Sequence, residues 1–431
     1  VGGSKLSFDA KRSGDLVVPY IKTAEGKMTD DIEGELKKDF TILTIGSAVS
    51  MLGNAVSGFA LGLLILDYTN STFLYSLTLV IYTLPRIVMP LLAGPYLDRF
   101  SRKKIIYTLD FISATLYLTI FALLMFNFLN YILIVILALI IGSIDGTYIV
   151  AFDSFFPNVV EKENFSKAYS ISSILYPLSA VMIPVAAYFY EHFSLAPLFA
   201  FNAITFLIAA IFETNIKAEE KHINEETAKS FVFSRYKEDF KTGIQYLKQE
   251  PGLAAITAYF VIMAFSDSSY GTLVLPYFKN NETFGVMTYT YVMAFAVLGR
   301  LIGGLLQYRF KYPPKKRFSI AIFVYITIGI MSAAFLFSPI ILMMIMNFLV
   351  GIFGVTSYNI RISSTQNYLP DGIRARFNGI FQMLTMMGAI VGQLLAGGLG
   401  DLFDERYIVA RFNIINLIML AFIIIPYGKH V

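Results

Sequence analysis

The chain has 431 residues, of which 56% are hydrophobic and 15% are charged, and its formal net charge is +4. Soluble domains carry about 25% charged residues, and the apolar residues here gather into stretches of about 20, the length of a membrane-spanning helix. The composition therefore predicts an integral membrane protein and excludes an ordinary soluble domain. Cysteine is absent, which excludes disulfides and cysteine catalysis. The three histidines do not lie at metal-ligand spacing, so no metal site is expected.

Residues 1–40 are polar and lack the apolar core of a signal peptide. We expect them to form a cytoplasmic N-terminal arm. Met28 is followed by Thr-Asp-Asp, as at a translation start. Residues 1–27 are therefore expected to be an extension, a tag or a disordered arm without a function of their own.

Twelve apolar segments follow this arm. Each is too long for a strand of a membrane barrel and lacks two-residue alternation. Backbone groups in lipid must be satisfied within their own segment, so all twelve are predicted to be helices. Their approximate bounds are 41–66, 72–97, 104–126, 130–156, 167–190, 195–214, 252–277, 284–309, 317–337, 339–360, 374–400 and 407–427. The predicted fold class is an all-α integral membrane protein with twelve transmembrane helices.

A repeat with an offset of 209 residues divides the segments into two sets of six. Gly94, which precedes a basic loop, aligns with Gly303, and the segment 158–171 aligns with 367–380 at the same offset. Duplicated halves embedded in the membrane are characteristic of secondary transporters. We therefore expect two pseudo-symmetric six-helix bundles.

The N-terminal bundle is expected to cover 41–214 and the C-terminal bundle 252–428, with a cytoplasmic linker at 215–251. In the linker, apolar residues at 236, 240, 244 and 247 follow a helical period. This predicts an amphipathic helix on the membrane surface. A regulatory or partner-binding role is the alternative.

Lys and Arg gather in alternate connections between the apolar segments. By the positive-inside rule, both termini and the basic loops are predicted to be cytoplasmic. The expected location is the plasma membrane, with several passes across it.

The basic loop after the second segment contains Gly94, Asp98, Arg99, Arg102 and Lys103. Gly94 allows close helix approach, Asp98 can accept from backbone groups at a helix end, and the basic side chains can bind anionic headgroups. A generic positive-inside loop is the alternative interpretation.

These residues resemble the signature loop between helices 2 and 3 of the major facilitator superfamily, whose pattern is G-x-L-a-D-r-x-G-r-k. Tyr96 replaces the usual leucine and Ser101 the second glycine. The resemblance covers about residues 40 to 428 and implies a twelve-helix fold whose halves move by alternating access. It also implies that Asp98 is the centre of a latch between the halves, with Gly303 and Arg309 in a weaker counterpart.

Within that superfamily, the chain is similar to the branch of macrolide and siderophore exporters. The similar pieces are 153–160, 201–206 and 236–248. One departure concerns the helix-5 element G-P-x-x-G-G of antiporters, because 183–187 keeps Pro184 but has alanines in place of the glycine pair.

Charged side chains inside the apolar segments are candidates for proton coupling, because they are costly there and usually have a partner or a function. Arg86 lies about 18 Å and Asp145 about 16 Å from the cytoplasmic ends of their helices. We expect the two to face each other, either as a static clamp or as a proton switch. Asp267 and Asp67 are the further candidates.

Two other acidic residues are expected to have simpler roles. Asp110 lies near the cytoplasmic face and is expected to brace the basic loop. Glu213 lies near a helix end and is expected at the membrane interface.

The resemblance places helices 1, 4, 7 and 10 around a central cavity. Aromatic and amide groups on these helices suit amphipathic or cationic organic molecules. The candidates for substrate contact are Asn54, Tyr148, Tyr259, Phe265, Asn347 and Tyr358. Ordinary packing is the alternative for each.

The leading functional prediction is proton-coupled efflux of amphipathic small molecules by alternating access, with the proton gradient as energy source. Uptake of a polar nutrient, movement of a lipid or lysolipid, and a non-transporting receptor are the alternatives. No phosphate-binding G-x-x-x-x-G-K-[ST] loop or hydrolase motif is present, so neither an enzyme nor a cofactor is expected. The expected partners are a small-molecule substrate and membrane lipids, without nucleic acid, and we expect a monomer.

Overall fold

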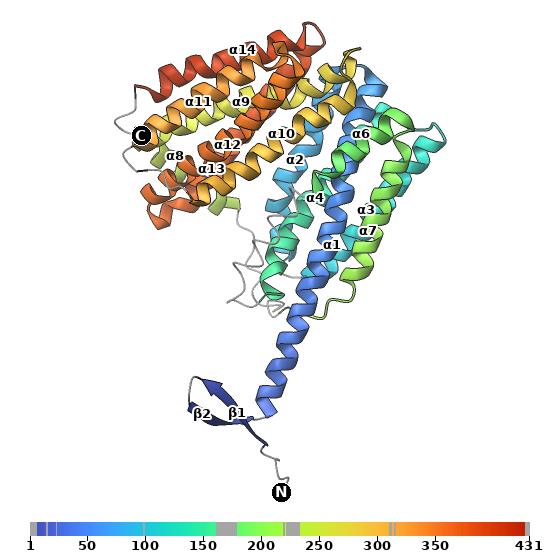
Figure 1. The fold of residues 1–431 in the computed structure, drawn as a ribbon, viewed down its shortest axis with the longest axis vertical. Coiled ribbons are helices and arrows are strands. Elements are labelled where there is room, and N and C mark those ends of the chain that lie inside the picture. Colours follow the sequence, from blue (N-terminus) through green and yellow to red (C-terminus); the bar gives the residue numbers. More distant parts are fainter. Residues whose placement is uncertain are drawn as a thin grey trace.

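Long apolar helices make up most of the chain in the computed structural model, which describes residues 7–13, 16–22, 24–97, 100–160, 179–218, 220, 233–309, 313 and 316–426 (Figure 1). The first helices are α1 (Ala24–Thr69), α2 (Thr72–Leu97), α3 (Arg102–Met125), α4 (Tyr131–Phe155), α6 (Met182–His192) and α7 (Ala196–Glu213). The later ones are α8 (Phe233–Gln249), α9 (Pro251–Asn280), α10 (Gly285–Arg309), α11 (Arg317–Ala334), α12 (Ile340–Tyr368), α13 (Asp371–Gly400) and α14 (Glu405–Met419). Short helical turns are η1 (Phe156–Asn158), η4 (Phe335–Phe337) and η5 (Leu420–Ile424).

Within the described residues, eleven helices are long and apolar enough to cross a membrane. They match eleven of the twelve predicted segments. The remaining one, 167–190, is represented by α6, and its part at 167–178 lies outside the described residues. The predicted all-α membrane fold is thus confirmed.

Polar side chains set several helix boundaries. Asn130 accepts a hydrogen bond from the Leu133 amide (3.0 Å) at the start of α4, as an N-cap residue does. Asn70 and Asn127 have positive φ angles of 48° and 55° in short connections, a conformation that asparagine tolerates better than most residues.

The N-terminal region is more ordered than expected. Residues 7–22 contain an antiparallel hairpin of β1 (Ser7–Ser13) and β2 (Leu16–Lys22), which lies beyond the helical body at the start of α1 (Figure 1). Helix α1 begins at Ala24 and not at 41. The polar stretch 24–40 contains three Glu and three Lys, which favour helix without any apolar run.

The helices pack in two groups with the same internal pattern. In the first group α2 packs on α4 and α3 on α7, and in the second α10 packs on α12 and α11 on α14. Two glycines 209 residues apart make equivalent close contacts. A Cβ atom at Gly142 would lie 2.1 Å from the Tyr82 carbonyl oxygen, and one at Gly351 would lie 2.4 Å from that of Ala296. The offset of the sequence repeat therefore recurs in the glycines, while their partners Tyr82 and Ala296 lie 214 residues apart.

Helix α8 lies where an amphipathic helix was predicted, but it packs on protein. Leu247 is buried against Phe377 and Ile380 of α13. The apolar face at this end of α8 therefore covers α13, and its place at the membrane surface stays a prediction.

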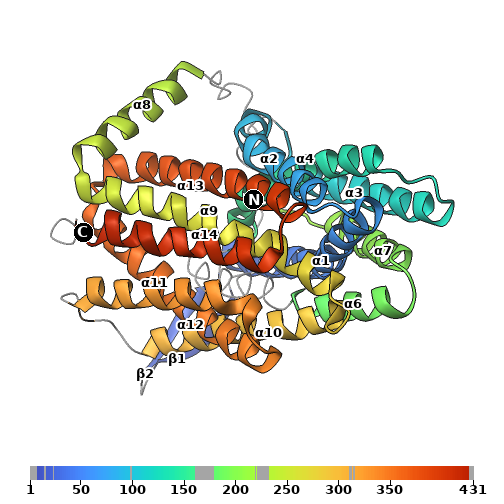
Figure 2. The ribbon, with the colours of Figure 1, turned by 90° about the horizontal axis from the view of Figure 1, so that it is seen from above.

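The two groups meet through α2 with α13 and through α6 with α10 (Figure 2). These contacts form a second equivalent pair, since each joins an early helix of one group to a later helix of the other.

Candidate functional site

Helices α2 and α4 approach closely because α4 carries glycines on the contact face. A Cβ atom at Gly146 would lie 2.9 Å from the Arg86 Cα, and the Gly142 contact with Tyr82 is closer still. A larger side chain would separate the helices. The glycines therefore place Tyr82 and Arg86 beside the residues that flank Gly146.

Asp145 is the half-buried acidic residue at this contact. The Tyr82 hydroxyl donates a hydrogen bond of 2.5 Å to Asp145 Oδ2. The Arg86 guanidinium carbon lies 5.3 Å from the centroid of the Tyr82 ring, within the range of a cation–π contact. Arg86 and Asp145 were expected to face each other. They occupy one site, but Tyr82 is the direct partner of both.

The other two candidates for proton coupling are separate from this site. Asp67 forms an ion pair of 2.9 Å with Lys279 and accepts a hydrogen bond of 3.0 Å from the Tyr190 hydroxyl. This ion pair joins the end of α1 to the end of α9, so it connects the two groups. Asp267 is exposed on α9.

Asp110 and Glu213 differ from their expected positions. Both are 1% exposed, inside the first group. Glu213 is therefore not at an interface with solvent, and Asp110 lies beside it without a hydrogen bond to the described part of the basic loop. The positions of Asp110 and Glu213 in the sequence did not indicate that both side chains are buried.

The end of α13 is bound to the start of α2. Asp401 accepts hydrogen bonds from the Ser71 hydroxyl (2.6 Å), the Thr72 amide (2.6 Å) and the Thr72 hydroxyl (2.8 Å). The Thr72 hydroxyl also contacts the Gly397 carbonyl oxygen at 2.7 Å. Partial burial disfavours the Asp401 carboxylate, but these hydrogen bonds outweigh it and lower its pKa below the ordinary value. A carboxylate at a helix N-terminus is also favoured by the free amides there.

An equivalent contact binds α6 to α10. Glu191 Oε1 accepts a hydrogen bond of 2.8 Å from the Met287 amide in the first turn of α10. Gly285, with a φ angle of +69°, leaves room for this carboxylate, because a Cβ atom there would lie 3.3 Å from it. Glu191 and Asp401 are 210 residues apart, within one residue of the repeat. Each group thus offers a carboxylate to a helix start of the other.

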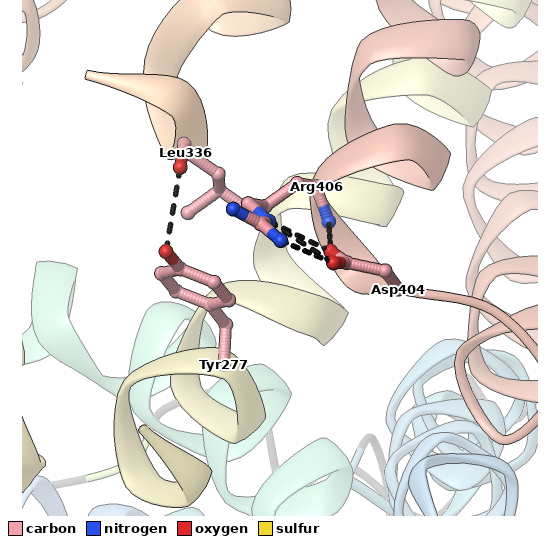
Figure 3. A network of polar contacts seen from close by, with 4 residues as sticks. All are labelled: Tyr277, Leu336, Asp404 and Arg406. Carbon is pink, nitrogen blue, oxygen red and sulfur yellow. Dashed lines mark hydrogen bonds and ion pairs between the residues drawn. The ribbon is translucent and has the colours of Figure 1, made fainter. Parts of the chain in front are cut away.

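The same end of the second group contains a local polar network (Figure 3). Arg406 donates to Asp404 at 2.6 to 3.1 Å, and the Tyr277 hydroxyl contacts the Leu336 carbonyl oxygen at 3.4 Å. The hydrogen bond from Arg406 lowers the pKa of Asp404. Asp404 thus caps the start of α14, three residues after Asp401.

The predicted latch is described only in part. Gly94 lies in α2, while Asp98 and Arg99 lie outside the described residues. The latch therefore stays a prediction.

Arg102 and Lys103 begin α3 and bind parts of the first group. Arg102 Nη1 donates to the Ser154 carbonyl oxygen (2.9 Å) and the Arg102 amide to Glu220 Oε1 (2.6 Å). Lys103 Nζ donates to the Ala218 carbonyl oxygen at 3.0 Å. These contacts tie the loop to the segment that leaves α7.

Gly303 lies within α10, inside the predicted segment 284–309. A Cβ atom there would be 2.9 Å from the Ile352 Cα of α12. Its described contact is therefore helix packing inside the second group.

Three of the predicted cavity residues lie in polar or aromatic contacts, two of them between helices and that of Tyr148 within α4. Asn54 on α1 is half-buried and lies 3.4 Å from the Asn202 amide nitrogen of α7. Tyr148 stacks on Phe152 with ring centroids 6.1 Å apart. Asn347 is buried and accepts a hydrogen bond of 2.7 Å from the Tyr270 hydroxyl.

Two further cavity candidates pack inside the second group. Tyr259 is 1% exposed and contacts Tyr325 at 5.2 Å between centroids, so packing is the better interpretation for it. Phe265 stacks on Phe412 at 4.7 Å.

Tyr358 is exposed and lies beside an arginine that the sequence analysis missed. The Arg361 guanidinium carbon is 4.7 Å from the Phe381 centroid, 5.3 Å from Phe260 and 5.4 Å from Tyr358. This cluster joins α9, α12 and α13. The predicted helix ended at residue 360, directly before Arg361, whereas α12 continues to Tyr368. Arg361 was missed because the predicted helix was too short to include it.

Comparison with known proteins finds relatives of this amino-acid sequence. An uncharacterized MFS-type transporter, YkuC of Bacillus subtilis (strain 168), is 25% identical over 300 residues, which are 67% of this chain and 68% of the relative. Macrolide efflux protein A of Streptococcus pyogenes is 26% identical over 277 residues, which are 63% of this chain. The matched region spans 66% of that protein's length.

Solved structures share the fold. The nucleoside transporter NupG superposes with a TM-score of 0.69 at 13% identity, covering 90% of this chain and 98% of NupG. A bacterial homologue of the iron transporter ferroportin, in an inward-facing state, gives 0.62 at 14% identity, covering 89% and 98%. The sequence profile of the Major Facilitator Superfamily matches residues 43–392. The chain therefore belongs to the major facilitator superfamily of membrane transporters.

Proposed function

We propose that this transporter exports amphipathic small molecules, such as macrolide-like compounds or siderophores, in exchange for protons. The relation to macrolide efflux protein A carries the proposal for the substrate class. Asp145, held by the Tyr82 hydroxyl inside a helix pair, supports the proposal for coupling. An acidic side chain in such a place usually has a function.

The coupling step follows from the contacts of Asp145. Its ionised form accepts the Tyr82 hydrogen bond and balances the charge of Arg86. A proton on Asp145 removes that negative charge and weakens both interactions. Tyr82 and Arg86 belong to α2, which packs on α13 of the other group. Protonation therefore acts on a helix at the contact between the moving parts.

The contacts between the groups support an inward-facing arrangement. The end joined by Asp401 and Glu191 carries the connections that the positive-inside pattern places outside the cell. In that orientation, the outer end is closed. The likeness to the ferroportin homologue in its inward-facing state agrees with this assignment.

The aromatic cluster around Arg361 supports an amphipathic substrate. Phe260, Tyr358 and Phe381 offer flat apolar surfaces beside one cation. Ligand sites combine such surfaces with few polar groups. The likeness to NupG is one of fold alone, so nutrient uptake and lipid movement enter as outcomes of the experiment.

The test measures accumulation of labelled macrolides, cationic dyes and siderophores in efflux-deficient cells, with and without a protonophore. Wild type is expected to lower accumulation of at least one compound, and the protonophore is expected to abolish the effect. Asp145→Asn should return accumulation to that of cells without the transporter. Tyr82→Phe should weaken export in part, because it removes one hydrogen bond from the carboxylate.

Asp404→Asn is the matched control, because Asp404 binds Arg406 within the second group, apart from the Asp145 site. Export that survives Asp145→Asn would make that carboxylate structural. If wild type extrudes no compound in any condition, uptake or lipid movement replaces export.

A further inference from the structure

A pair of carboxyl groups is buried within the first group, apart from the Asp145–Tyr82 contact. Asp110 lies on α3 and Glu213 is the last residue of α7, and these helices pack on each other. Their carboxyl groups lie within hydrogen-bonding reach of each other. None of the four carboxyl oxygens has a hydrogen-bond donor among the described residues.

Hydroxyl groups surround this pair without satisfying it. A Cβ atom at Gly46 would lie 2.9 Å from Glu213 Oε1, so that carboxyl rests against the backbone of α1. The neighbouring Ser47 is 6% exposed, and its hydroxyl has no partner in the described part of the chain. The Tyr148 hydroxyl of α4 is also buried without one, and it lies near Ser47 and both carboxyls.

Among the described residues, the charged neighbour given for the pair is itself acidic. The titratable neighbours that the structure gives are Tyr148 and Asp145, both on α4. No basic side chain forms an ion pair with either carboxyl among the residues described. Two ionised carboxylates would therefore repel each other in a water-poor interior, which is strongly unfavourable.

A proton resolves this conflict. An ionised carboxylate only accepts hydrogen bonds, whereas a protonated carboxyl also donates one. With one proton between them, the contact of two acceptors becomes an O–H···O hydrogen bond. The net charge of the pair then changes from −2 to −1. Paired carboxyl groups in other proteins share a proton for this reason.

We propose that Asp110 and Glu213 form a second proton-binding site, in which the two carboxyl groups share one proton that is taken up and released during transport. The coupling to transport rests on the proposed function, whereas the shared proton does not. Ser47 and Tyr148 provide hydroxyl groups that can hydrogen-bond to the pair in either state. The proton enters from water and returns to water, so no other reactant is required.

A metal ion is a weaker occupant for this site. Within the described residues, no group of three or more His, Cys, Asp or Glu side chains could hold one. Divalent cations generally require more oxygen ligands than one carboxyl pair supplies.

The first experiment records infrared difference spectra of the purified full-length protein over a range of pH and of sodium concentration. Besides any band from Asp145, wild type is expected to show the C=O band of one protonated carboxylic acid from the pair, which disappears as the pH rises. Asp110→Asn and Glu213→Gln should each abolish this band, because the amide supplies the missing donor. Asp145→Asn and Asp67→Asn should retain it.

A thermal-stability series gives a second readout from the same samples. Wild type should lose stability once the pH is high enough to remove the shared proton. Asp110→Asn should melt at a temperature that depends less on pH, because its amide donates to Glu213 permanently. A wild type without the band, a band that persists in both amide variants, or a site that sodium titrates in place of protons would overturn the shared proton.

Transport then tests the coupling separately. If compounds are exported, Asp110→Asn and Glu213→Gln should reduce the pH dependence of export. Unchanged pH dependence would overturn the coupling step while leaving the spectroscopic result intact. If no compound is exported, the proposed function fails, and the band still decides whether the proton is shared.

Discussion

Gly142 is the residue on which the geometry of the Asp145 site depends most directly. A methyl group at this position would lie 2.1 Å from the Tyr82 carbonyl oxygen, so α2 and α4 would have to move apart. Overpacking of this kind costs about 1–3 kcal/mol. We therefore expect Gly142→Ala to lower the melting temperature of the purified protein.

Gly58→Ala is the control for that change. Gly58 is also helical, but a Cβ atom there would meet nothing within 4 Å. Its alanine variant should be as stable as wild type or gain up to about 1 kcal/mol from helix propensity. Equal melting temperatures for Gly142→Ala and wild type would contradict the described helix contact.

The repeat supplies a comparison that separates stability from coupling. Gly351→Ala creates a similar overlap between α10 and α12, with the Ala296 carbonyl oxygen at 2.4 Å. Both variants should be destabilised. Only Gly142→Ala should also change the pH dependence of export, because only α2 and α4 carry the Tyr82–Asp145 hydrogen bond. Similar pH profiles for the two variants would argue against a special role for the first contact.

At the scale of elements, the carboxylate of Asp401 joins α13 to the start of α2. Asp401→Asn removes the charge and places an amide group among donors, so we expect the joint to weaken by about 1 kcal/mol, a small value because the residue is exposed. Hydrogen exchange at the amides of Thr72 and Phe73 measures this directly. Asp404→Asn is the control, because its partner, Arg406, lies in the same group.

The pH dependence of this joint follows from the lowered pKa of Asp401. A carboxyl whose pKa is lower in the folded state stabilises the fold above its unfolded value of about 3.9 and loses that contribution as the pH falls through the folded value. The joint should therefore stay intact from neutral to mildly acidic pH. Opening of the joint in wild type at mildly acidic pH would contradict this.

At the scale of the whole molecule, the apolar stretches predicted the helices well and their polar ends poorly. Length and hydrophobicity suffice for a membrane helix, because lipid leaves the backbone few alternatives. Where a helix leaves the apolar layer that signal stops, so the early start of α1 and the late end of α12 were missed. Arg361 was missed with the end of α12.

Contacts between distant side chains were beyond a single sequence. The sequence indicated that Arg86 and Asp145 lie at similar depth, but not that Tyr82 lies between them. The burial of Asp110 against Glu213 depends on how α3 packs on α7, which no local pattern specifies. The 209-residue repeat predicted the paired packing because it relates whole helices rather than single contacts.

Alternating access requires the contact between α2 and α13 to open in every cycle, and this can be tested by a crosslink. The chain has no cysteine, so an introduced pair would provide its only thiols. A Cβ atom at Gly400 would lie 3.3 Å from the Thr72 Cβ, close to the 3.5–4.5 Å separation of a disulfide. We expect Thr72→Cys with Gly400→Cys to crosslink on oxidation and to stop transport until a reductant is added.

The matched pair Gly243→Cys with Arg376→Cys joins α8 to α13 inside the second group, at a Cβ separation of 3.5 Å. It should crosslink as readily without stopping transport, because it leaves the two groups free to move. Transport that continues with the first pair fully crosslinked would show that the end closed by Asp401 does not open during the cycle. The substrate would then have to cross without the rocking of two groups. The comparison of these two crosslinks therefore tests the alternating-access mechanism.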